Sequence, residues 1–275
     1  MPELPEIEVL RRSLEPRLLG RRIERVEVRA PALREPLDRR TLARRLEGRA
    51  VEALRRRSKY LLVDVEGGST LVVHLGMSGR LTLAPDGAPR EPHEHLAFRL
   101  DRGERLRLRD PRRFGVAFAA ATAGLLERDP HFAHLGREPL EPRLAGAELA
   151  AIARGLKAPA KAFLMDATRV VGVGNIYATE ALFRAGIHPA RSVARISRER
   201  FERLAEAVVA VLEEAIREGG TTLNDFTDGA GVEGEFQIAL AVYGREGEPC
   251  PRCAAPVRRL VQSNRSSFYC PRCQR

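Results

Sequence analysis

The spacing of apolar positions changes along the first half of the chain. Between residues 3 and 19 apolar side chains recur at helical spacing, and Gly20 is a suitable stop, so the chain is predicted to open with an amphipathic helix. Short alternating runs, typical of β-strands, then continue to about residue 120. This half is therefore predicted to be an antiparallel β-sandwich or barrel that follows one helix. The predicted strands cover residues 51–57, 60–65, 70–75, 80–83, 96–100, 106–108 and 115–119.

The second half of the chain has helical periodicity. A stretch rich in Pro, Gly and His, which lacks a sustained period, precedes it, and we place a linker there at residues 131–145. The fold class is therefore predicted to be α+β, with a first domain at 1–130, a helical domain at 146–241 and a cysteine-containing tail at 242–275. The predicted helices cover residues 146–154, 158–165, 175–184 and 197–218.

All four cysteines lie in that tail. They form two Cys-x-x-Cys pairs, Cys250 with Cys253 and Cys270 with Cys273, separated by sixteen residues. This is the spacing of a four-cysteine zinc ribbon, and four thiolates fill a tetrahedral shell, so we expect one structural Zn²⁺ without a catalytic role. The basic and polar stretch between the pairs is predicted to form a strand-turn-strand suited to a phosphate backbone.

Charge and hydropathy narrow the class of protein. Forty-seven Lys and Arg against 37 Asp and Glu give a net charge of +10, which favours a polyanionic partner such as nucleic acid or an acidic membrane face. Only three of the basic residues are lysine, as GC-rich coding would also produce, so the charge alone does not decide the partner. No apolar run is long enough to span a bilayer and no signal peptide is recognisable, so we expect a soluble, cytoplasmic protein.

Two local motifs could carry chemistry, and each has an ordinary alternative. Gly174 and Asn175 stand before a predicted helix, where backbone N–H groups can bind an anion or simply cap the helix. If Met1 is removed, Pro2 becomes a secondary amine at the positive end of a helix, which would lower its pKa and make it a nucleophile. Glu3 and Glu6 could then transfer protons. The alternative is that proline followed by acidic residues is a common helix start.

Taken together, the motifs resemble the formamidopyrimidine-DNA glycosylase family, in family order over nearly the whole chain. The matching pieces are Pro2-Glu-Leu-Pro-Glu6, Lys59-Tyr-Leu-Leu, His74-Leu-Gly-Met77-Ser-Gly, Asp110-Pro-Arg112-Arg-Phe114-Gly, Gly172-Val-Gly-Asn175-Ile-Tyr, Val242-Tyr-Gly-Arg, and the zinc ribbon with Arg265 before its second cysteine pair.

The resemblance implies a fold and a reaction. The fold would be a catalytic helix with a β-sandwich, then a helix-two-turns-helix domain with the zinc finger, and a monomer would bind damaged double-stranded DNA. Pro2 would attack the sugar C1′, expel the damaged base and nick the strand by β,δ-elimination through a Schiff base. Other catalytic residues would be Glu3, Lys59 and Arg265, with Glu6 in support.

The resemblance also implies residues that contact DNA. Met77, Arg112 and Phe114 would fill the gap left by the flipped nucleotide. Asn175 and Arg265 would hold the flanking phosphates, and Lys161 is a further expected DNA-binding residue.

Lesion preference and some roles stay open at this point. Asn224 stands where relatives often carry lysine, Arg109 precedes the Asp-Pro-Arg-Arg-Phe motif where other residues are common, and residues 227–236 would cover the flipped base. The alternatives are an endonuclease VIII-like enzyme for oxidised pyrimidines and a non-catalytic zinc-ribbon protein that binds lesions. A metallohydrolase using His93, His95, His131 and His134 is the least favoured, because a third ligand with its carboxylate partner is lacking.

Overall fold

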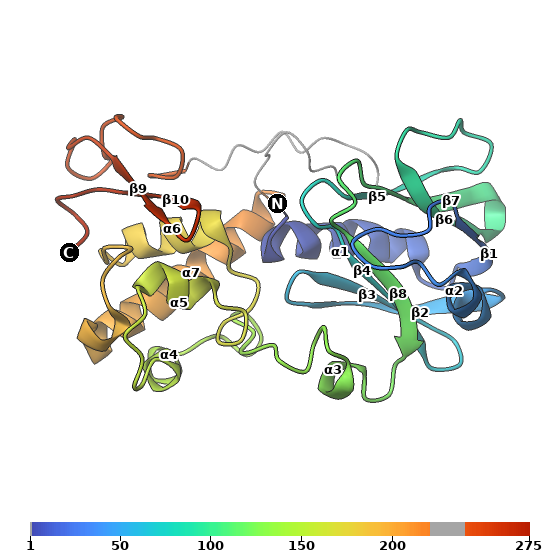
Figure 1. Cartoon of the computed structure of the whole chain (residues 1–275), viewed down its shortest axis with the longest axis horizontal. Coiled ribbons are helices and arrows are strands. Elements are labelled where there is room, and N and C mark those ends of the chain that lie inside the picture. Colours follow the sequence, from blue (N-terminus) through green and yellow to red (C-terminus); the bar gives the residue numbers. More distant parts are fainter. Residues whose placement is uncertain (1, 221–239) are drawn as a thin grey trace. The chain divides into compact units, whose positions relative to one another are not determined.

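The computed structural model describes residues 2–220 and 240–275 (Figure 1). Asn224 and the 227–236 segment lie outside these residues. The chain forms two compact units: of the described residues, 2–133 and 219–220 belong to the first, and 134–218 and 240–275 to the second. Within the described ranges, no helix is both long and apolar enough to cross a membrane.

The first unit begins with helix α1 (Leu4–Leu18) and continues as an antiparallel sheet (Figure 1). The strand order is β5-β7-β6-β1-β2-β3-β4-β8. The strands are β1 (Arg22–Val28), β2 (Arg49–Arg57), β3 (Tyr60–Val65), β4 (Ser69–His74), β5 (Arg80–Pro85), β6 (Glu94–Leu100), β7 (Glu104–Arg109) and β8 (Val116–Ala121). Two short helices, α2 (Arg39–Leu46) and α3 (Leu125–Arg128), complete this unit.

At the middle of the strand order, β1 and β2 are joined by a short ladder. Their register has only the pairs Arg22↔Ala50 and Ile23↔Arg49, whereas β3 and β4 pair along their whole length. One core of buried side chains from both halves and from α1 fills the interior, with Leu14 and Phe98 fully buried. The predicted helix and antiparallel sandwich are therefore confirmed.

Three elements of the first unit were not predicted. In β1 a register shift between Ile23 and Arg25 breaks the alternation that identifies a strand. Helix α2 buries only Leu42 and Leu46, and α3 has a single turn, so both have too few apolar positions to show a period.

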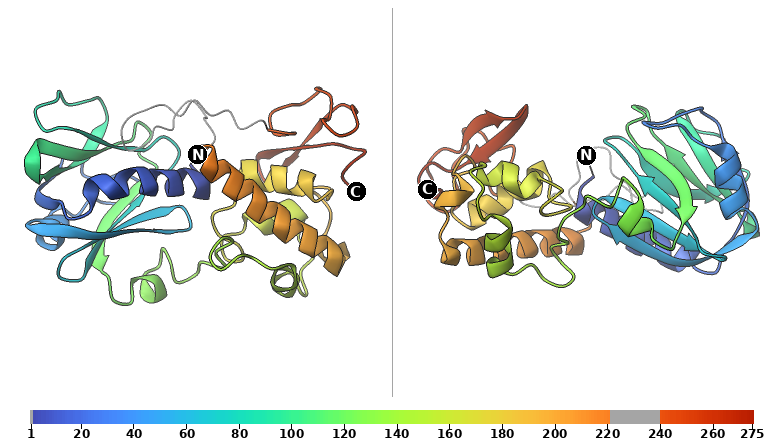
Figure 2. Two further views of the ribbon diagram at one scale, coloured as in Figure 1. Left: turned by 180° about the vertical axis from the view of Figure 1, so that it is seen from behind. Right: turned by 60° about the horizontal axis from the view of Figure 1, so that its bottom comes forward.

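The second unit is a small helical bundle with a β-hairpin. Its helices are α4 (Gly146–Ile152), α5 (Ala160–Met165), α6 (Asn175–Arg184) and α7 (Arg198–Arg217), and the hairpin is β9 (Arg258–Gln262) with β10 (Arg265–Tyr269). The long α7 packs against α4 and α6 (Figure 2). Helix α6 has the predicted bounds, and residues 176–183 are all buried. The predicted helical domain with a four-cysteine finger is confirmed.

Candidate active site and nucleic-acid interface

The start of α1 holds two buried carboxyl groups. Glu3 is the N-cap, and its backbone N–H donates to Oε2 of Glu6 at 2.7 Å in a capping box. Glu3 and Glu6 are 3% and 2% exposed, and Pro2 lies immediately before them. The Pro2 nitrogen lies at the end of the helix that carries partial positive charge. The three predicted residues of the N-terminal motif are thus brought together.

Glu8 ties this helix to the strand that leads to Lys59. Burial opposes ionisation of Glu8, but hydrogen bonds from Arg11 and Arg12 outweigh it and lower the pKa of the carboxyl group. Arg56 Nε, on β2, lies 3.4 Å from Glu8 Oε2. Helix α1 is therefore held against β2 next to the turn at residues 58–59.

Lys59 lies in the tight turn between β2 and β3 and is half-buried. Its charge acts on His74, at the end of β4, where burial, together with the charges of Lys59 and Arg34, lowers the pKa to about 4. The neutral imidazole accepts a hydrogen bond from Gly76 N–H at Nδ1, at 3.0 Å. Tyr60 pairs with His74 in the sheet, so Lys59, one residue before Tyr60, lies next to the start of the loop of residues 75–79, which carries Met77.

That loop is packed against a second loop, residues 110–115. Asp110 is fully buried, and its carboxylate accepts hydrogen bonds from Ser78 Oγ at 2.7 Å and from Gly115 N–H at 2.8 Å. Gly76 has a φ of +63°, and a Cβ there would lie 2.4 Å from the carbonyl carbon of Phe114. The two loops therefore form one rigid surface.

This surface presents the residues predicted to fill the gap in the DNA. Met77 and Phe114 are 39% and 45% exposed, and the Arg112 guanidinium lies 4.7 Å from the centroid of the Phe114 ring. Among the described residues only two other large apolar side chains, Leu19 and Val261, are comparably exposed. Because apolar exposure is so restricted, these two loops are a credible contact surface for stacked bases.

In the second unit, Asn175 begins α6 directly after Gly174. Its Nδ2 lies 3.2 Å from the hydroxyl of Tyr243, whose ring packs edge-on against Phe268 of β10, with the centroids 5.3 Å apart. Residues at the start of α6 and on the hairpin are thereby connected.

A buried acid that the sequence analysis missed holds this connection in place. Glu180 is 3% exposed, and its carboxylate accepts the N–H groups of Ala241, Val242 and Tyr243 at 2.8 to 3.0 Å. The available signal was an acidic residue in the middle of the mostly apolar stretch 176–183, since a buried carboxylate requires partners. Tyr243 belongs to the Val242-Tyr-Gly-Arg motif, but the sequence alone predicts no role for it.

Lys161 and Arg265 both lie at the hairpin, but in different environments. Lys161 is 2% exposed, and its Nζ donates to Ser266 O and Ser267 Oγ, both at 2.8 Å. Arg265 is exposed and follows a turn in which Ser263 and Asn264 have positive φ. Lys161 therefore fixes the strand that presents Arg265, and its ammonium is directed into the protein.

The four cysteines form one cluster at the base of the hairpin. Their sulfur atoms all lie within 4.8 Å of one another, with Cys250 and Cys273 3.9 Å apart and Cys253 and Cys270 3.4 Å apart. Zn–S bonds of about 2.3 Å in a tetrahedron require S···S distances of about 3.8 Å, so the cluster fits zinc. Backbone N–H groups of Arg252 and Cys273 point at Cys250 and Cys270 sulfur at 3.4 Å, as thiolates would require.

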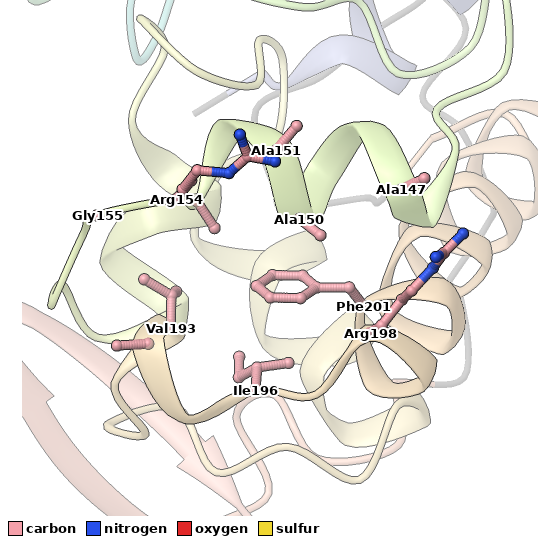
Figure 3. Close-up of a pocket in the computed structure, with 11 residues that line it drawn as sticks. Ala147, Ala150, Ala151, Arg154, Gly155, Val193, Ile196, Arg198 and Phe201 are labelled. Atoms are coloured by element: carbon pink, nitrogen blue, oxygen red, sulfur yellow. The ribbon is translucent and has the colours of Figure 1, made fainter.

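Neither the pocket in the second unit nor the histidines of the chain provide a second catalytic site. A pocket of about 590 Å³ between α4 and the start of α7 has apolar walls that include Ala150 and Phe201, with Arg154 and Arg198 at its rim, but no group that could act as a nucleophile or base (Figure 3). Apart from the cysteine cluster, no set of three metal-binding side chains is found among residues 2–220 and 240–275. The metallohydrolase alternative is therefore unsupported.

Three known protein-domain families match successive segments of the chain. The models of the formamidopyrimidine-DNA glycosylase N-terminal domain, its H2TH domain, and a zinc finger found in FPG and IleRS match residues 1–117, 135–227 and 247–275. The chain belongs to the formamidopyrimidine-DNA glycosylase family. Family members from Syntrophotalea carbinolica and Stenotrophomonas maltophilia are each 49% identical over 275 residues, with 100% of both chains covered.

Solved structures of formamidopyrimidine-DNA glycosylases share the fold. The MutM (Fpg) protein from Thermus thermophilus has a TM-score of 0.87 at 41% identity, covering 99% of this chain and 98% of that one. Lactococcus lactis Fpg in complex with DNA containing an abasic site has a TM-score of 0.90 at 32% identity, covering 99% of both chains.

Proposed function

We propose that this protein is a base excision repair enzyme that removes oxidised purines from duplex DNA and cleaves the strand at the resulting site. The observation that carries this proposal is the pair of buried carboxyl groups at the N-terminus of α1, directly after Pro2, where the Glu6 carboxylate accepts the backbone N–H of Glu3. Combined glycosylase and lyase chemistry needs a nucleophilic amine and an adjacent general acid/base, and this motif contains both.

The chemical steps use the residues of this motif. After removal of Met1, the Pro2 nitrogen forms a bond to C1′ as the bond from C1′ to the base breaks, and the amine proton leaves with the expelled base. Glu3 then protonates O4′ of the sugar. The ring opens to an iminium, which makes the C2′ protons acidic. The Glu3 carboxylate then takes a C2′ proton as the C3′–O bond breaks and the 3′ phosphate leaves. Loss of a C4′ proton breaks the C5′–O bond and expels the 5′ phosphate. Glu6 keeps the N-terminal backbone in place through its bond to Glu3 N–H.

Flipping the damaged nucleotide costs a few kcal/mol of stacking, which other contacts must offset. The loops at 75–79 and 110–115 supply these contacts: Phe114 wedges between base pairs, Met77 occupies part of the gap, and Arg112 donates hydrogen bonds to the unpaired base. The contact of the Arg112 guanidinium with the Phe114 ring supports this assignment, because the two side chains would enter the DNA together.

Cationic and polar groups would hold the phosphates. Lys59, Asn175 and Arg265 are accessible for this role, and Arg265 can bind a phosphate with two parallel hydrogen bonds. We assign Lys161 an indirect role, since its buried ammonium fixes the hairpin. One bound Zn²⁺ would crosslink the two cysteine pairs and give the hairpin a stable base, and a monomer suffices for binding.

The test is borohydride trapping on duplex DNA carrying 8-oxoguanine opposite cytosine, followed by mass spectrometry of the crosslinked peptide. An adduct on Pro2 is expected, and a verified form that retains Met1 should give none. Cleavage by the Met1-retaining form at the normal rate would refute Pro2 as the nucleophile.

A second duplex, which carries an oxidised pyrimidine in place of 8-oxoguanine, tests the lesion assignment. This comparison is needed because Lactococcus lactis Fpg has been solved in complex with DNA containing an oxidised pyrimidine. Faster excision of the pyrimidine would favour the endonuclease VIII-like alternative. DNA binding without any adduct would favour the non-catalytic lesion-binding protein.

A further inference from the structure

Arg109, which precedes the Asp-Pro-Arg-Arg-Phe motif, pairs with Glu91, which lies in the connection between β5 and β6. It is the last residue of β7, directly before the loop 110–115. Its Nη1 donates to Oε2 of Glu91, and its Nε donates to the carbonyl of Pro92 at 3.1 Å. The other oxygen of Glu91 pairs with Arg107. One carboxylate thus bridges two arginines on the same face of β7.

Residues close to Glu91 also bond to the first residue of the loop 110–115. Asp110 N–H donates to His93 O at 3.0 Å, and His95 Nε2 lies 3.0 Å from Asp110 O. Residues 91–95 therefore contact both the side chain that ends β7 and the backbone that begins the loop.

The same segment is anchored to the core on its other side. Glu91 N–H donates to Oε2 of Glu94 at 3.3 Å. Glu94 is fully buried and pairs with Arg29, directly after β1. Residues 91–95 can therefore transmit the rigidity of the sheet to the loop.

We propose that Glu91 is a positioning residue, which acts through Arg107 and Arg109 to set the orientation of Arg112 and Phe114 for entry into the DNA. This inference rests on the proposed function. Without the carboxylate, Arg107 and Arg109 lie side by side on one face of β7 with no anion between them, and Arg109 loses one of its two bonds to residues 91–92. Small errors in the placement of interacting groups cost large factors in rate, so we expect about a fivefold slower entry of the wedge.

The experiment compares Glu91→Ala with Asp86→Ala. Asp86 is a matched control: it follows β5 in the same connection and pairs with Arg99 of β6, but it has no bond to the loop. A 2-aminopurine on the strand opposite 8-oxoguanine, next to the facing cytosine, reports unstacking by stopped-flow fluorescence. We expect the rate of the fluorescence rise to fall about fivefold in Glu91→Ala and to stay within about twofold of wild type in Asp86→Ala.

Two further readouts separate positioning from general destabilisation. Both alanine variants should melt at similar temperatures, and Glu91→Gln, which keeps one acceptor oxygen, should give an intermediate rate. Equal rates in wild type, Glu91→Ala and Glu91→Gln would overturn the inference and leave the proposed function intact. No fluorescence rise in wild type, despite DNA binding, would refute the proposed gap filling and this inference with it.

Discussion

Gly76→Ala tests how closely the two loops of the proposed DNA surface are packed. A Cβ at this position would lie 2.4 Å from the carbonyl carbon of Phe114 and 2.6 Å from Gly115 N, and both obstacles are backbone atoms. The backbone φ is +63°, so alanine would also be strained by about 1 kcal/mol. Relieving the clash requires a backbone shift, which typically costs about 1–3 kcal/mol in a well-packed site. We therefore expect a total loss of about 2–4 kcal/mol.

Two other glycines of the same unit separate these contributions. Gly103 has a φ of +74° with nothing within 4 Å of an added Cβ, so Gly103→Ala measures the backbone term alone. Gly87 has neither a positive φ nor a neighbour within 4 Å, so Gly87→Ala should be nearly neutral.

The assay for all three variants is urea unfolding followed by circular dichroism, with excision of 8-oxoguanine measured in parallel. Gly76→Ala should also slow excision, because the displaced backbone belongs to Phe114. If Gly76→Ala costs no more than Gly103→Ala, the close packing of the loops is wrong.

Three other predictions concern the rest of the chain. Burial alone would lower the pKa of His131, but hydrogen bonds to Asp129 and Glu35 raise it above the usual value. The stability that these bonds contribute to the folded state is complete below about pH 6.5 and is lost as pH rises through the raised pKa. Urea unfolding should therefore show His131→Gln to be more destabilising at pH 6 than at pH 9. Cys253→Ser should lower bound zinc, measured by atomic absorption, and weaken DNA binding about tenfold or more, since the hairpin loses its base; full affinity without zinc would contradict this role. Lys161→Met should leave Ser266 O and Ser267 Oγ without their donor and cost about 1–3 kcal/mol in urea unfolding; a neutral effect would show that the ammonium does not hold the hairpin.

Features encoded over short distances could be derived from the amino-acid sequence. The zinc ligands are the clearest case, because two Cys-x-x-Cys pairs specify a tetrahedral site by their spacing alone, and the structure gathers their sulfur atoms within 4.8 Å. Helix α6 was predicted with its observed bounds, because its apolar residues follow a helical period and Gly174 precedes its first turn. Strand β1 was missed where a register shift breaks the alternation.

Only the tertiary structure decided which side chains support the predicted site residues. Lys161 is a predicted DNA-binding residue, and only the structure shows that its ammonium donates to Ser267, 106 residues further along the chain. Glu180 holds the segment that places Tyr243 next to Asn175, and Glu91 holds the end of β7. Such partners meet because strands and helices distant in sequence are packed together. Periodicity shows which face of a helix or strand is buried, but not which residues pack against that face. The motif residues can therefore be identified from the sequence, whereas the contacts that support them cannot.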